Sequence, residues 1–129
     1  MKIDSLNLVL QKNFNLNKKI YFISGNEFSL INEIKEIVIE KYKRELFKVI
    51  KIENISDIFS PGDLFGGRRI CIIKDIQSLN EEMIKHCLGL EDIFVMIFEN
   101  SPKIKKIKEI LNKENNAFVI DCYELTKEN

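Results

Sequence analysis

The chain has 129 residues, of which 45% are hydrophobic and 31% are charged, and its 20 basic residues balance its 20 acidic ones. This length suits one domain with a substantial core better than two domains. A zero net charge argues against a domain that binds nucleic acid mainly through its own positive charge. No apolar run approaches the roughly 20 residues that a membrane-spanning helix needs, and the N-terminus lacks the pattern of a signal peptide.

The cysteine content indicates a reducing compartment. Cys71, Cys87 and Cys122 are far apart in the sequence, and an odd, unclustered set favours free thiols over a disulfide framework. With a single histidine, His86, and no CxxC pair, the sequence offers no zinc site. We therefore expect a cytoplasmic protein that carries no metal and no cofactor.

The first half of the chain alternates between helical and strand patterns. Residues 5–11 have apolar side chains at helical spacing, and residues 18–24 form a short apolar run that predicts a buried strand. A long amphipathic helix is expected from Glu27 onward, because apolar residues then recur every three or four positions. Residues 46–53 alternate and predict a second strand, after which Asn54 would cap a short helix.

The second half continues the alternation. Residues 68–74 predict a third strand, and a helix is expected from Asn80 to Gly89. Residues 93–98 are apolar throughout, which predicts a central strand. Pro102 opens a basic amphipathic helix, and residues 117–121 predict a fifth strand.

Apolar strands that alternate with amphipathic helices over short connections predict a fold class. We expect residues 1–129 to form a single α/β domain with a doubly wound, mostly parallel five-stranded sheet and helices on both faces.

The turn Gly25-Asn26-Glu27, after the first long strand, is where a phosphate loop would lie in such a fold. A working loop needs the pattern G-x-x-x-x-G-K-[ST], whose backbone N–H groups, lysine and hydroxyl hold phosphate and magnesium. Counted from Gly25, the second glycine, the lysine and the hydroxyl positions hold Leu30, Ile31 and Asn32. We expect a degenerate phosphate loop that caps a helix. A divergent nucleotide-binding enzyme is the alternative.

Asp75 ends the predicted third strand, where many nucleotide hydrolases carry a magnesium-binding carboxylate. Without a phosphate loop, its expected role is to begin a turn. A phospho-acceptor role, as in a response-regulator receiver, would need a pair of acids after the first strand, where only Glu27 is found. The nucleophile motif G-x-S-x-G is also absent, so we expect no catalytic residues.

The stretch PGDLFGGRR, residues 61–69, places Leu64 and Phe65 among turn-forming residues. Burial of each side chain is worth about 1.5–3 kcal/mol, so a domain would be expected to hide both unless a partner covers them. The residues alone leave two interpretations open: the pair folds back over its own sheet, or it binds a partner.

Two stretches together resemble the N-terminal domain of the delta subunits of the bacterial DNA polymerase III clamp loader. YFISGNEFSLINE matches the opening of that family, an apolar strand followed by G-[NS]-E-x-x-L-[LI]-x-E. DLFGGRRICIIKD matches its S-L-F-G-x-[RK]-[RK] element and the hydrophobic strand behind it. IFVMIFEN, followed by SPKIKK, fits a later strand and its polar turn, so the resemblance covers the whole chain in order and spacing.

The resemblance implies an AAA+ domain that has lost its phosphate loop and does not hydrolyse ATP. Delta subunits bind the sliding clamp, the ring-shaped beta subunit, and favour its opened form, so that the ring can be placed on primed DNA during replication. By position, Leu64 and Phe65 would enter an apolar pocket on the clamp, with weaker contributions from Asp63, Gly66 and Arg68.

The resemblance also carries expectations about assembly. Gly62 stands where some relatives have a larger apolar residue, which removes one apolar contact, and Arg69 is expected to add positive charge beside Arg68. The family continues into a helical lid and a collar that contacts the other loader subunits. We therefore expect an excised N-terminal domain that is monomeric by itself and meets DNA only indirectly.

Overall fold

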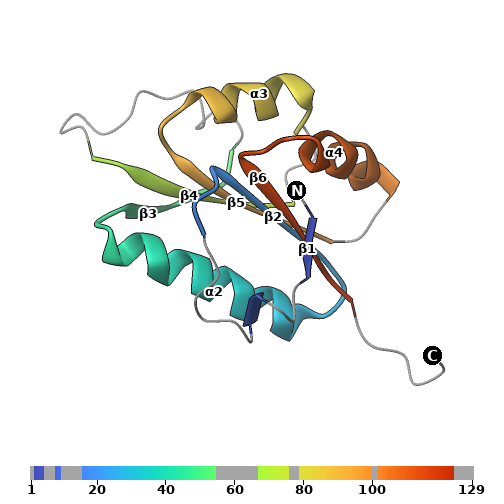
Figure 1. Ribbon diagram of the computed structural model, residues 1–129, viewed down its shortest axis with the longest axis horizontal. Coiled ribbons are helices and arrows are strands. Elements are labelled where there is room, and N and C mark those ends of the chain that lie inside the picture. The colour runs from blue at the N-terminus through green and yellow to red at the C-terminus, as the bar shows by residue number, and fades with distance from the viewer. Residues whose placement is uncertain are drawn as a thin grey trace.

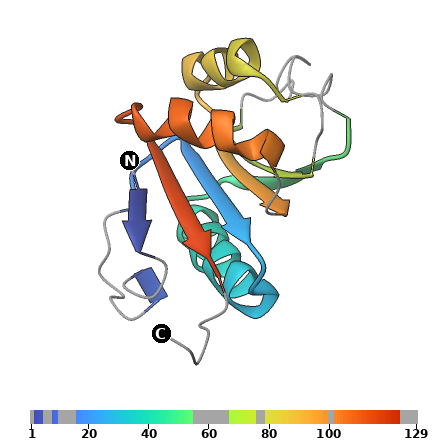
Figure 2. The same ribbon diagram turned by 90° about the vertical axis from the view of Figure 1, so that its right-hand side faces the viewer.

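The computed structural model describes residues 2–4, 8–9, 16–54, 67–75, 79–99 and 102–123 (Figure 1). There, six strands form one sheet in the order β1-β6-β2-β5-β4-β3, and every neighbouring pair runs parallel. The five predicted strands are confirmed, and the structure adds a short strand, β1, beside β6 at the sheet edge (Figure 2). The strands are β1 Lys2–Asp4, β2 Ile20–Gly25, β3 Lys48–Ile52, β4 Arg69–Lys74, β5 Ile93–Glu99 and β6 Ala117–Cys122.

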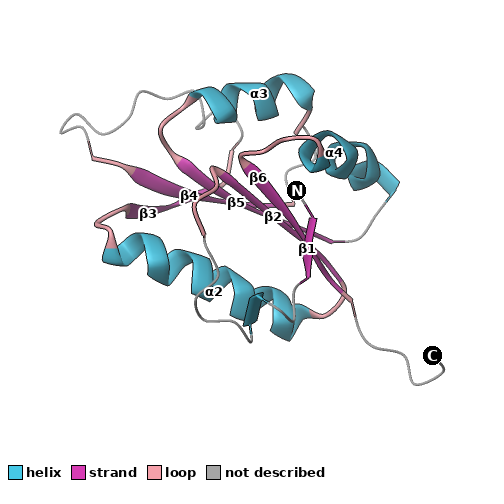
Figure 3. Cartoon of the chain, in the orientation of Figure 1, coloured by secondary structure: helices cyan, strands magenta, loops and turns pink. Residues whose placement is uncertain are grey.

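Helices lie on both faces of the sheet, as predicted. α2 (Phe28–Arg44) covers one face, and α3 (Glu81–Gly89) and α4 (Pro102–Asn112) lie on the other (Figures 1 and 3). The doubly wound α/β fold is therefore confirmed. Of the helix predicted at residues 5–11, only Leu8 and Val9 are described, and both are helical. The helix predicted after Asn54 lies outside the described residues.

The sheet separates two apolar cores. Tyr21 and Val95 point to the α2 side, where they join Ile34 of α2. Phe22 points to the opposite side, where it joins Ile84 of α3. In β5 every residue from Ile93 to Phe98 is buried, because the strand lies between β2 and β4 with both faces covered.

Polar side chains cap the starts of two helices. The Glu27 carboxylate accepts a hydrogen bond from the Ser29 N–H (3.2 Å), so Glu27 is the N-cap of α2 and not its first helical residue. The Asn80 side chain accepts from the Met83 N–H (3.0 Å) and caps α3, as predicted. α3 therefore begins where the capping rules place it, and α2 begins one residue later than predicted.

A leucine in the left-handed conformation, Leu46, follows the C-terminal cap of α2. Leu46 has φ 68°, its N–H donates to the Lys43 carbonyl (3.0 Å), and the Phe47 N–H donates to the Tyr42 carbonyl (2.9 Å). Glycine is usual at this position, because a Cβ in the left-handed conformation costs about 1–2 kcal/mol. The Leu46 side chain is 90% exposed, so its own burial does not offset that cost.

Two tyrosines link β2 to α2 within the core. The hydroxyl oxygens of Tyr21 and Tyr42 are 2.7 Å apart. The Tyr42 oxygen also lies 3.1 Å from the carbonyl oxygens of Leu16 and Lys18, and the Lys18 N–H donates to the Tyr21 oxygen (3.0 Å). Burial raises the pKa of both phenols, so they stay neutral and hold the segment before β2 against the core.

Candidate functional site

The carboxyl ends of the parallel strands share one edge of the sheet, where ligands of α/β folds usually bind. Gly25 ends β2 there and pairs with Cys122 of β6. Its φ is 139°, and a Cβ placed on it would lie 1.9 Å from the Cys122 carbonyl oxygen. Only glycine allows β2 and β6 to approach this closely.

Two backbone donors of the turn Gly25-Asn26-Glu27 are already used inside the fold. The N–H groups of Asn26 and Glu27 donate to the Cys122 carbonyl oxygen at 2.9 and 3.0 Å. The Glu27 carboxylate also places a negative charge at the N-terminus of α2, where a phosphate would bind in a working loop. The geometry therefore favours a turn that closes the sheet and caps α2.

Asp75 has the geometry of a turn residue. It adopts φ 50°, which aspartate tolerates better than most residues, and its N–H donates to the Ile97 carbonyl (2.9 Å). Its carboxylate accepts from the Glu99 N–H (3.0 Å). These bonds join the ends of β4 and β5, which supports the expected turn role.

The predicted clamp-binding residues are only partly described. Asp63, Leu64, Phe65 and Gly66 lie outside the described residues. The exposed Arg68, which directly precedes β4, has its guanidinium carbon 4.6 Å from the ring centre of Phe47, so it contacts the end of the α2 turn.

Arg69 serves the fold instead of a partner, contrary to the expectation from the sequence. Its guanidinium donates to the Asp92 carboxylate through both Nε and Nη2, and the two side chains are only 11% and 13% exposed. The pair joins the start of β4 to the residue before β5. Because an arginine buried this far needs its carboxylate, Arg69 cannot supply free positive charge at the surface.

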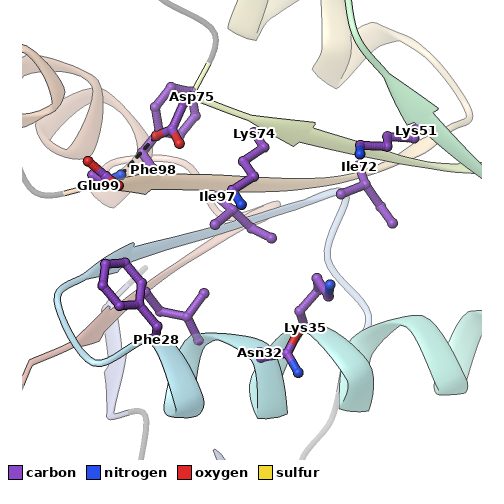
Figure 4. Close-up of a pocket in the computed structure, with 11 residues that line it drawn as sticks. Phe28, Asn32, Lys35, Lys51, Ile72, Lys74, Asp75, Ile97, Phe98 and Glu99 are labelled. Carbon is purple, nitrogen blue, oxygen red and sulfur yellow. Dashed lines mark hydrogen bonds between the residues drawn. The ribbon is translucent and has the colours of Figure 1, made fainter.

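A groove that the sequence did not predict lies beside α2, over the adjoining faces of β3 and β4 and the end of β5. It consists of two neighbouring hollows of about 520 and 690 Å³, and Lys35 and Ile72 line both. Phe28 walls the first hollow (Figure 4), and Leu46 and Val49 wall the second. We call these two hollows together the α2–β3 groove.

The charges around the first hollow are unevenly placed. Lys35 of α2, Lys51 of β3 and Lys74 of β4 border it, so lysines from three elements surround one space (Figure 4). Asp75 and Glu99 lie on the side away from Lys51. The sequence predicted the strand at residues 46–53, and Lys48, Val49 and Lys51 of β3 are exposed. The sequence pattern did not reveal which helix would lie beside these side chains.

In the part of the chain that the structure describes, no group of three histidine, cysteine or acidic side chains could hold a metal ion. No helix in that part is long and apolar enough to cross a membrane. The sequence matches no protein-family model, and a search of curated proteins gives no significant match.

Proposed function

We propose that this chain is the non-catalytic, clamp-binding domain of a delta-type subunit of the DNA polymerase III clamp loader. The observation that carries the proposal is the sequence DLFGGRR at residues 63–69, joined directly to the buried strand β4. In this proposal Leu64 and Phe65 enter an apolar pocket of the sliding clamp and favour the opened ring during DNA replication in the cytoplasm. Leu and Phe side chains buried together in one pocket are suited to be binding hot spots.

The turn after β2 supports a domain without ATPase activity. A nucleotide would need free backbone donors there, and those of Asn26 and Glu27 are bonded to the Cys122 carbonyl. The Glu27 carboxylate at the N-terminus of α2 would also repel phosphate. An AAA+ domain that has lost its phosphate loop is expected to have these features.

The strand order argues against two other types of α/β domain. If β2 to β6 are numbered 1 to 5 along the chain, their order in the sheet is 5-1-4-3-2. This differs from the 3-2-1-4-5-6 order of dinucleotide-binding folds and from the 2-1-3-4-5 order of receiver-type folds. The receiver interpretation of Asp75 therefore lacks the topology it needs.

Calorimetry with the sliding clamp of the same organism tests the proposal. The double substitution Leu64→Ala, Phe65→Ala should weaken binding by about 2–4 kcal/mol. The matched control is Phe28→Ala, Leu46→Ala, which removes an exposed phenylalanine and an exposed leucine elsewhere on the surface. Equal binding by the parent and the Leu64/Phe65 variant would refute the assigned site, and no binding by the parent would refute the function.

A thermal-shift titration tests the alternative, a divergent nucleotide-binding enzyme. ATP, ADP and GTP with magnesium should leave the melting temperature unchanged, because the N–H groups of Asn26 and Glu27 are already bonded to the Cys122 carbonyl. A concentration-dependent rise would favour the divergent nucleotide-binding enzyme instead.

A further inference from the structure

We propose that the α2–β3 groove is a second docking surface. It binds an amphipathic helix of a partner protein, and this helix carries acidic residues along the border of its apolar face. The groove is formed by α2, β3, β4 and the end of β5, and not by the residues assigned to clamp binding. The proposal therefore holds or fails independently of the proposed function.

Exposed apolar side chains gather in this groove. Among the described residues, four large hydrophobic side chains are exposed: Phe28, Leu46, Val49 and Tyr123. The first three line the groove. Phe28 lines the first hollow, and Leu46 and Val49 line the second. Single exposed apolar residues are ordinary, but several along one groove are typical of an interaction surface.

The conformation of Leu46 adds an independent indication. Leu46 occupies a left-handed position that glycine would adopt without strain, and its side chain extends into the solvent at the second hollow. The leucine therefore stabilises the C-terminal end of α2 less than glycine would, and its side chain gains no burial. A partner that covers the side chain would account for its presence at this position.

The shape of the groove fits a helix. On the opposite face two helices, α3 and α4, pack on the sheet, whereas α2 is the only long helix described on this face (Figure 1). The exposed floor of the groove spans β3 and β4, with Val49 and the half-buried Ile72 facing outward. Two strands are about 10 Å wide, which is also the usual distance between packed helices, so one helix would fit beside α2.

The charges indicate an acidic partner. Lys35, Lys51 and Lys74 border the first hollow, and the surface contact of Lys35 with Glu36, at 3.8 Å, offsets little of that charge. Nucleic acid would satisfy these lysines but leave the apolar walls uncovered. Because Asp75 and Glu99 lie on the side away from Lys51, the acids of the partner should face β3.

A displayed library of helical peptides, selected against the whole chain, tests the proposal. We expect the recovered peptides to carry apolar residues at i, i+3 or i+4 and i+7, with an excess of Asp and Glu. In fluorescence polarisation, Lys35→Glu, Lys51→Glu should weaken these peptides by about tenfold or more. The matched control, Lys105→Glu, Lys106→Glu, changes two exposed lysines of α4 on the opposite face and should change affinity less than about twofold.

A second variant distinguishes a loss of binding from a loss of folding. Leu46→Gly removes the apolar side chain and relieves the strained turn, so the melting temperature should stay level or rise while peptide affinity falls about fivefold or more. Failure to recover peptides, or recovered peptides that bind all variants equally, would overturn the proposal. So would self-association that Leu46→Gly abolishes, because the occupant would then be a second copy of the chain.

Discussion

The close approach of β2 to β6 makes Gly25 the most sensitive glycine among the described residues. In Gly25→Ala the new Cβ would lie 1.9 Å from the oxygen and 2.5 Å from the carbon of the Cys122 carbonyl. Backbone atoms cannot rotate away as a flexible side chain can. The ends of the two strands must therefore separate.

The cost can be worked out from the bonds involved. Separation breaks the hydrogen bonds from Asn26 and Glu27 to Cys122, each worth about 1 kcal/mol net. An alanine held near φ 139° adds about 1–3 kcal/mol. We expect the free energy of unfolding to fall by about 3–5 kcal/mol, out of the 5–15 kcal/mol typical of a domain.

Urea denaturation followed by circular dichroism measures this loss. Gly89→Ala is the matched control, because a Cβ placed on Gly89 would meet no described atom within 4 Å apart from its chain neighbours and the backbone of its own helix. Gly89 is the last residue of α3, so alanine there should be neutral or stabilise by up to about 1 kcal/mol. A Gly25→Ala loss below about 1 kcal/mol would refute the close approach and the occupied loop donors that depend on it.

Three further predictions concern buried polar groups. Tyr42→Phe should lower the free energy of unfolding by about 1–3 kcal/mol in urea titrations, because its hydroxyl is the hydrogen-bond partner of buried groups on three residues. Asp92→Ala should cost about 3 kcal/mol, because it leaves the buried Arg69 guanidinium without its carboxylate. Burial raises the pKa of Cys71 to about 11 and that of Cys87 to about 12, so both thiols should react slowly with a thiol reagent at pH 8. The unfolded chain loses its thiol protons first, so the stability from these groups is complete below about pH 9 and declines as the pH rises toward 11 and 12.

Each of these predictions has an outcome that would contradict it. A neutral Tyr42→Phe would mean that the phenol network adds nothing to stability. Arg69→Met, Asp92→Leu should cost less than Asp92→Ala alone, and the reverse order would show that the charge itself stabilises the fold. Thiol labelling as fast in the native protein as in urea would contradict the burial of the cysteines, and so would a stability that is unchanged between pH 8 and pH 11.

The fold was predictable where the sequence pattern admits one structural solution. Residues 93–98 are apolar on both faces of a strand, which fits only the interior of a covered sheet, and β5 lies there. Asn80 was readable as a cap because its side chain bonds the helix that it precedes. In both cases the information is local.

The features that the sequence did not predict depend on contacts between distant parts of the chain. The Cys122 carbonyl reaches the turn at Gly25 only through the register of β2 with β6, which no local pattern specifies. Arg69 was misassigned for the same reason, since its partner Asp92 comes near only when β4 pairs with β5. The three residues of β1 are too few to give a strand signal. The α2–β3 groove follows from which helix covers which face, a property of the assembled layers.

The tyrosine pair gives the protein an optical reporter of its own packing. The chain has no tryptophan and three tyrosines, of which Tyr21 and Tyr42 are buried edge to face while Tyr123 is 39% exposed. The tyrosine part of the near-ultraviolet circular dichroism of the native state should therefore arise mainly from these two buried rings, which pack on each other and on Phe118 and Phe47. Its disappearance while far-ultraviolet ellipticity persists would reveal a loosened core in any variant, without an added chromophore.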